Sequence, residues 1–135
     1  MNFKRFDANL KPNFLIPNHL ELQIYDIIEQ LKQNKPIQYI FCTTEFYGLP
    51  FYVDESVLIP RPETEELVQW ILEDLGSNNH LRIIDIGTGS GCIPVALAKN
   101  LPEATVMGVD ISEKASSCIR NLLVSLQRHI LDFFS

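Results

Sequence analysis

The residues best suited to binding a ligand lie at 83–91, in the run IIDIGTGSG. An apolar stretch ends at Asp85, and from Gly87 onward every second position is glycine. Glycine has no Cβ and adopts positive φ readily, so a ligand can lie directly against the backbone of such a loop. The dinucleotide fingerprint G-x-G-x-x-G does not fit, because its third glycine would fall at Cys92. The pattern is instead D-x-G-x-G-x-G.

A second acid stands at a spacing that suits a nucleoside. Asp110 ends the run ATVMGVD, nineteen residues after Gly91. A carboxylate at roughly this distance from a glycine loop can accept hydrogen bonds from both ribose hydroxyls of an adenosine. The spacing therefore predicts an adenosine-type cofactor, without specifying what the adenosine carries. Glycines that serve only a tight turn are the simpler alternative, but that alternative leaves Asp85 and Asp110 unexplained.

The apolar pattern around the loop predicts the elements that position it. Residues 81–86 and the run ATVMGVD are expected to form buried strands, and CIPVALAKNL between them a helix with Pro94 in its first turn. Ser112 can cap a further helix. Strand, helix and strand at this spacing are typical of a parallel crossover unit, whose ligands bind at the carboxyl ends of the strands. The predicted fold class is therefore α/β.

Two helices and a hairpin are expected before this unit. Residues 17–35 predict an amphipathic helix capped by Asn18, and residues 43–53 a hairpin that turns at Gly48-Leu49. A second helix starts near Pro62, and its early glutamates suit the positive end of the helix dipole. Gly76 is expected to end it, and its apolar stripe comprises Leu67, Val68, Ile71, Leu72 and Leu75.

The last twenty residues, 116–135, predict one more helix, with an apolar stripe that ends at Phe133 and no evident third strand.

Composition excludes several classes of protein. A net charge of −6 on 135 residues makes nucleic acid an unlikely partner, because phosphate backbones are repelled. No apolar stretch has signal-peptide length or approaches the roughly 18 residues of a membrane span, so a cytoplasmic location without membrane contact is expected. Three widely spaced cysteines without a C-x-x-C pair suit reduced thiols, and neither a disulfide nor a metal site is predicted.

The run EFYGLPFYVDESVLIPRPETEELVQWIL, followed by IIDIGTGSGCIPVALA and VDISEKA, resembles the PrmC/HemK family of methyltransferases. That family uses S-adenosylmethionine to methylate the glutamine of the GGQ motif in peptide chain release factors. The resemblance covers roughly residues 35–115. It implies a Rossmann-like S-adenosylmethionine-dependent methyltransferase core with an incomplete parallel sheet, preceded by a helical segment and a β-hairpin.

The resemblance also implies an organisation and a site. Residues 1–42 would be part of a helical substrate-recognition domain, 43–56 a hairpin linker, and 57–135 the N-terminal part of the methyltransferase domain. The segment IPRPETE, in which Arg61 stands between two prolines, would lie beside the cofactor. Asp110 would hold the ribose and Asp85 would orient the methionine end. The full set of cofactor residues implied is Asp85, Gly87, Thr88, Gly89, Ser90, Gly91 and Asp110.

The acceptor half of the family's site is absent. An N-P-P-Y motif after the fourth strand would grip the glutamine amide, and no N-P-P occurs in this sequence. No catalytic residue is therefore assigned, and the chain alone is expected to be inactive although its family is enzymatic. The closing DFFS resembles an acid-aromatic pair near the adenine, which makes Phe133 a candidate stacking residue, but core packing is the favoured role.

Two other functions remain open at this point. A nucleic-acid adenine methyltransferase shares the glycine loop and an N-P-P-Y-type motif, but it would need a basic cleft. A non-catalytic module that binds an adenosine ligand or another protein needs neither. The gene beyond codon 135 would distinguish these, because an N-P-P-Y motif there favours an enzyme.

Overall fold

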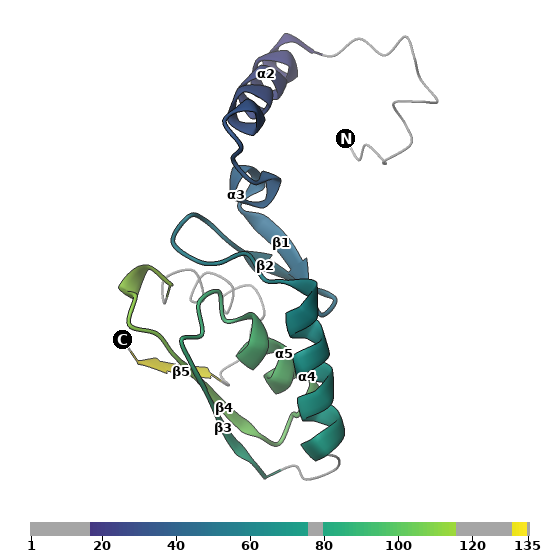
Figure 1. Cartoon of the computed structure of the whole chain (residues 1–135), viewed down its shortest axis with the longest axis vertical. Helices are drawn as coiled ribbons and strands as arrows, with labels where there is room; N and C mark the ends of the chain where they lie inside the picture. The colour runs from purple at the N-terminus through teal and green to yellow at the C-terminus, as the bar shows by residue number, and fades with distance from the viewer. Residues whose placement is uncertain (1–16, 76–79, 116–130, 135) are drawn as a thin grey trace. The chain divides into compact units, whose positions relative to one another are not determined.

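The computed structural model describes residues 17–75, 80–115 and, as backbone, 131–134 (Figure 1). The chain divides into two compact units, residues 1–36 and residues 37–135. In the part of the chain that is described, no helix is both long and apolar enough to cross a membrane.

The first unit contains helix α2 (Asn18–Lys32). The predicted cap at Asn18 is wrong, because the N-cap position is Pro17 and Asn18 is already helical. The backbone of Pro17 is extended, with ψ 141°, and its carbonyl accepts hydrogen bonds from Leu20 N and Glu21 N. The helix therefore starts from a proline carbonyl, without a side-chain cap.

The second unit begins with α3 (Ile37–Phe41) and a hairpin of β1 (Thr43–Phe46) and β2 (Leu49–Tyr52). Its turn is Tyr47-Gly48, one position before the predicted one. Both residues have positive φ, 50° and 68°, as a two-residue turn of type I′ requires. Tyr47 thus adopts a conformation that normally favours glycine.

Helix α4 (Pro62–Leu75) packs its inner face on the core. Val68 is fully buried, and the partly buried Ile71, Leu72 and Leu75 pack beside it. The assignment of Leu67 to this stripe is wrong: 44% of its surface is exposed, because it lies about 100° around the helix from Val68. Gly76 lies outside the described residues.

The aromatic side chains of the hairpin contribute to the same core. Phe46 and Phe51 are each 1% exposed, and their rings meet edge to face with centroids 6.1 Å apart. Both rings therefore belong to the core, where they pack against each other.

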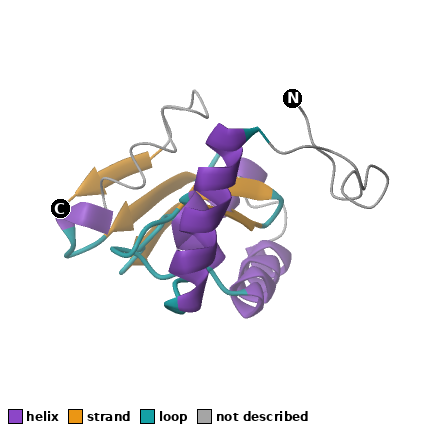
Figure 2. Cartoon of the chain, turned by 90° about the horizontal axis from the view of Figure 1, so that it is seen from above, coloured by secondary structure: helices purple, strands orange, loops and turns teal. Residues whose placement is uncertain are grey.

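The predicted crossover unit is present as β3 (Arg82–Ile86), α5 (Cys92–Asn100) and β4 (Thr105–Val109). β3 and β4 are parallel, and β5 (Leu131–Phe134) pairs in parallel with β4, so the strand order is β3-β4-β5 (Figures 1 and 2). The prediction that residues 116–135 form a helix, with no third strand, is wrong for the residues of β5. A short apolar segment fits the hydrophobic pattern of a helix or of a strand, and the backbone pairing with β4 makes this one a strand. Residues 116–130 lie outside the described residues.

One face of the sheet is covered by helices. α5 packs on β3 and β4, and α4 packs on α5 (Figure 1). Val106 on the covered face is fully buried, but Ile84 and Ile86 are 56% and 79% exposed. The prediction that both strands are buried is therefore wrong for β3, because the described helices leave its other face bare. Among the described strands, β3 also has a neighbour along one edge only, which fits an incomplete sheet.

Candidate cofactor-binding site

The loop between β3 and α5 requires its glycines for their backbone conformation. Gly87, Gly89 and Gly91 have φ of 77°, 55° and 74°, which is a strained region for residues with a Cβ. A Cβ built on Gly87 or Gly89 would meet no atom within 4 Å. Packing within the protein therefore does not demand glycine here. The space beside these two residues is open, so a ligand can approach the bare backbone.

Hydrogen bonds tie this loop to the end of the neighbouring strand. Gly87 N and Thr88 N both donate to the carbonyl of Val109, at 2.8 and 3.1 Å. Within the loop, Gly91 N donates to the carbonyl of Thr88 at 2.9 Å. Because Val109 ends β4, these bonds hold the carboxyl ends of β3 and β4 together. The predicted site residues, which are Asp85, residues 87–91 and Asp110, thus meet at one end of the sheet.

Asp110 contacts the glycine loop directly. Its Oδ2 accepts a hydrogen bond from Gly89 N at 2.8 Å, and its Oδ1 accepts one from Ser112 N at 2.9 Å. A carboxylate has about four acceptor positions, so each oxygen can still accept from a ligand hydroxyl. The sequence did not predict the bond to Gly89, because the two residues are 21 apart and no local pattern links them.

Ser112 also has the capping role that the sequence predicts. Its Oγ accepts a hydrogen bond from Ala115 N at 3.3 Å, three residues into the following turn.

Two buried polar atoms near the loop lack a partner among the described residues. They are Asp85 Oδ2 and Thr88 Oγ1, each with almost no accessible surface. A buried polar atom without a hydrogen bond costs roughly 1 to 3 kcal/mol. A bound polar ligand would remove that cost, so these atoms fit a cofactor that brings its own donors. An ammonium group suits Asp85, because a buried carboxylate needs an opposite charge.

Cys92 begins α5 beside these groups, but it is not a nucleophile. Burial raises the pKa of its thiol, the nearby Asp85 carboxylate adds to the increase, and a hydrogen bond with Ser90 partly opposes it. The thiol is therefore protonated at neutral pH, and thiols are poor nucleophiles. Ser90 is itself 4% exposed, so both side chains support the loop from inside. Among the described residues, no group of three or more potential ligands could hold a metal ion.

The segment IPRPETE connects the hairpin to α4. Ile59 is buried and Arg61 is exposed. Glu65 Oε1 accepts a hydrogen bond from Tyr47 N at 3.0 Å, and the Tyr47 hydroxyl donates to Gln69 Oε1 at 2.6 Å. Glu65 thus anchors the hairpin turn, beyond the predicted interaction with the helix dipole. The location of the segment beside the cofactor stays a prediction.

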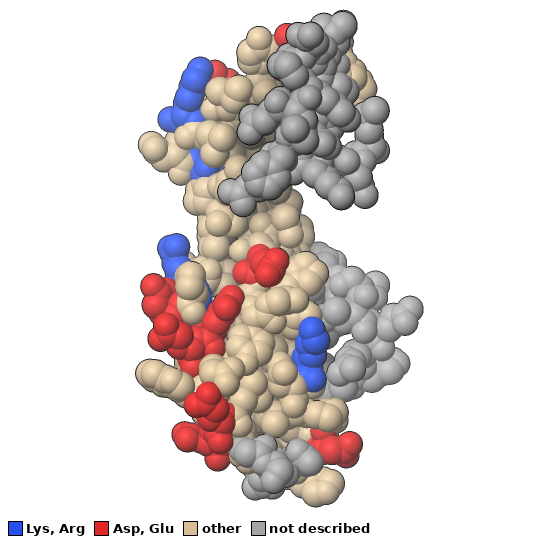
Figure 3. Space-filling model, turned by 90° about the vertical axis from the view of Figure 1, so that its right-hand side faces the viewer, with Lys and Arg blue, Asp and Glu red and all other residues tan. Residues whose placement is uncertain are grey.

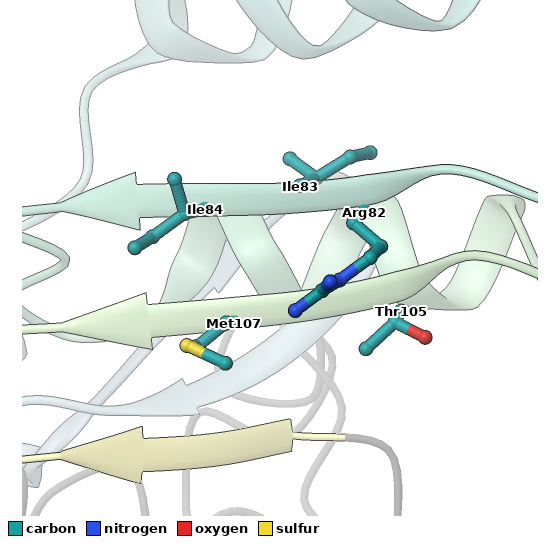
Figure 4. Close-up of a pocket in the computed structure, with 5 residues that line it drawn as sticks. All are labelled: Arg82, Ile83, Ile84, Thr105 and Met107. Atoms are coloured by element: carbon teal, nitrogen blue, oxygen red, sulfur yellow. The ribbon is translucent and has the colours of Figure 1, made fainter.

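A separate hollow of about 310 Å³ lies on the bare face of the sheet (Figure 4). It is at the amino ends of β3 and β4, the opposite end from the glycine loop. The residues that line it are Arg82, Ile83, Ile84, Thr105 and Met107. None of the predicted cofactor residues contributes to it, so it is not part of the candidate site.

A parallel β3-α5-β4 unit with a glycine loop and an acid after β4 is a Rossmann-like α/β arrangement, which suits an adenosine-type cofactor. A precorrin-6y C5,15-methyltransferase of Geobacter metallireducens has this fold, with a TM-score of 0.50 and 16% identity. The match covers 63% of the present chain and 43% of that one. It establishes the fold class predicted from the sequence.

The chain belongs to the methyltransferase small domain family, which matches residues 64–133. The release factor glutamine methyltransferase of Flavobacterium psychrophilum is 55% identical over 115 residues, covering 83% of this chain and 40% of that protein. That of Streptococcus pneumoniae is 54% identical over 98 residues, covering 72% and 34%. These relatives confirm the resemblance to PrmC/HemK. The chain spans two fifths or less of the length of either relative.

Proposed function

We propose that the chain carries the cofactor half-site of a release factor glutamine methyltransferase. The observation that supports this most directly is the contact between Asp110 and the loop at Gly89, which brings an acid and bare backbone together. The name of the relatives supplies the reaction: methylation of a release factor glutamine. A release factor as partner would place the protein in the cytoplasm.

S-adenosylmethionine would supply the methyl group, which its sulfonium makes electrophilic. In the proposed arrangement, the free acceptor positions of Asp110 receive the ribose hydroxyls. Asp85 Oδ2 accepts from the ammonium of the methionine end, and Thr88 Oγ1 is the second buried group able to bind it. Gly87 and Gly89 leave room for the cofactor against the backbone. This gives a role to each unpartnered atom of the site.

These residues bind the methyl donor, but they do not hold the acceptor. The nitrogen of a glutamine amide is a poor nucleophile, because its lone pair is delocalised. Transfer therefore requires the amide to be held at near-attack distance by well-placed acceptors. The N-P-P-Y motif that would provide them in the family is not in this sequence. We therefore propose that these 135 residues alone do not methylate a release factor.

The test compares the 135-residue chain with a version extended through N-P-P-Y. Each is incubated with a release factor and S-adenosylmethionine, and the release factor is analysed by mass spectrometry. We expect one added methyl group on the GGQ glutamine with the extended version and none with the short chain. A release factor whose GGQ glutamine is replaced by asparagine serves as the control acceptor. Equal rates for the two versions would show that the acceptor site lies within these residues after all.

A further inference from the structure

Helix α4 has a second face, opposite its buried one, that the described residues leave exposed. At about 100° per residue, six of its side chains fall within an arc of about 120°. We call this the outer face of α4; it consists of Glu63, Glu66, Leu67, Trp70, Glu73 and Asp74, and all six side chains are exposed.

The outer face carries two large apolar side chains that lie one helical turn apart. Trp70 is 63% exposed and Leu67, one turn before it, is 44% exposed. Val68, on the inner face, is fully buried and anchors the helix without them. Large apolar side chains that lie together on a surface mark interaction sites, and tryptophan is among the residues most enriched at the centres of protein interfaces.

The charge of the helix indicates what kind of partner it would bind. α4 contains five acidic residues and no lysine or arginine. Glu65 accepts a hydrogen bond from Tyr47 N, and the other four acids lie on the outer face. Figure 3 shows acidic side chains gathered on the side of the molecule where α4 lies. This negative surface repels phosphate backbones and anionic lipids, and it attracts a basic protein segment.

The geometry around Trp70 indicates which basic residue fits. Glu66, Glu73 and Asp74 lie four residues before it, three after it and four after it, so all three neighbour it on the helix surface. A flat cation above the indole would interact with the ring and with these carboxylates together. Arginine meets this requirement better than lysine, because its guanidinium stacks on aromatic rings and also binds carboxylates in a bidentate manner.

We propose that the outer face of α4 is a docking surface for a basic protein segment that places an arginine on Trp70. The proposal does not rest on the proposed methyltransferase function, because it uses only the exposed side chains and charge of α4.

The test uses a fluorescein-labelled oligo-arginine peptide and an oligo-lysine peptide of the same length, with affinity measured by fluorescence anisotropy. Trp70→Ala removes the ring, and Glu66→Gln combined with Asp74→Asn removes two of the charges. The matched control is Glu21→Gln combined with Glu103→Gln, which removes two exposed charges elsewhere. We expect oligo-arginine to bind about tenfold more weakly to both α4 variants. The control should change its affinity less than twofold, and oligo-lysine should bind the unaltered chain more weakly than oligo-arginine.

A second measurement does not depend on any variant. Trp70 is the only tryptophan in the chain, so its fluorescence reports directly on the outer face. Titration of the unaltered chain with unlabelled oligo-arginine should quench this fluorescence, and added salt should reverse the effect. The proposal is overturned if the fluorescence does not respond to bound peptide. Equal weakening by the control pair, or equal affinity for oligo-lysine, would also overturn it, since general acidity would then explain the binding.

Discussion

Replacement of Asp110 by alanine tests the cofactor site most directly. In the structure its carboxylate holds Gly89 N and Ser112 N and keeps acceptor positions free. Hydrogen bonds to a charged group contribute roughly 1.5 to 3 kcal/mol each, and the partial exposure of the site reduces the lower limit to about 1 kcal/mol. We therefore expect Asp110→Ala to weaken binding of S-adenosylmethionine by roughly 1 to 3 kcal/mol, which is about 5-fold to 150-fold in Kd.

Two mechanisms could cause that loss, and the assay has to separate them. Asp110 could bind the ribose, or it could act only by holding the loop at Gly89. Isothermal titration calorimetry with S-adenosylhomocysteine and with its 2′-deoxy analogue distinguishes the two mechanisms. The substitution can remove a contact between Asp110 and the 2′-hydroxyl only in the compound that carries this hydroxyl. If Asp110 binds the ribose, the substitution weakens binding of the parent compound much more than binding of the analogue. Equal weakening of both compounds would refute the ribose contact.

Three further predictions concern the loop, the hairpin and the buried thiol. Gly89→Val is expected to abolish detectable cofactor binding in calorimetry, because a β-branched residue is strained at φ 55° and would fill the open space beside the loop. Glu65→Ala is expected to lower the free energy of unfolding in urea by about 1 to 2 kcal/mol, since it leaves the part-buried Tyr47 N without its partner. The exposed Glu66→Ala, as the matched control, should change it by less than about 0.5 kcal/mol. The raised pKa of Cys92 predicts that stability falls as pH rises above the ordinary thiol value of 9.0, because the unfolded chain then binds fewer protons than the folded one; Cys92→Ala should remove this part of the decrease in urea unfolding at alkaline pH.

The sequence alone was sufficient for several features whose physical cause is local, although the cap of α2 and the exact turn of the hairpin were missed. The sequence predicted that the three loop glycines are needed for their backbone conformation, and each of them indeed has a positive φ. Pro62 marks the start of α4, because its missing N–H is not needed there. The sequence also predicted that the glycine loop and Asp110 lie at the same edge of the sheet, since a parallel crossover brings the carboxyl ends of consecutive strands together.

The tertiary structure alone decided which surfaces are covered and which distant groups meet. Residues 81–86 look like a buried strand because four of their six side chains are apolar, but the described helices cover only one face, so Ile86 is 79% exposed. Leu131–Phe134 is a strand because β4 offers it backbone partners, which its own short apolar pattern does not encode. The bonds from Tyr47 N to Glu65 and from Gly89 N to Asp110 join residues 18 and 21 apart. Periodicity and turn chemistry act over a few residues, whereas burial and long-range hydrogen bonds depend on how whole elements pack, and that packing joined Gly89 N to the Asp110 carboxylate.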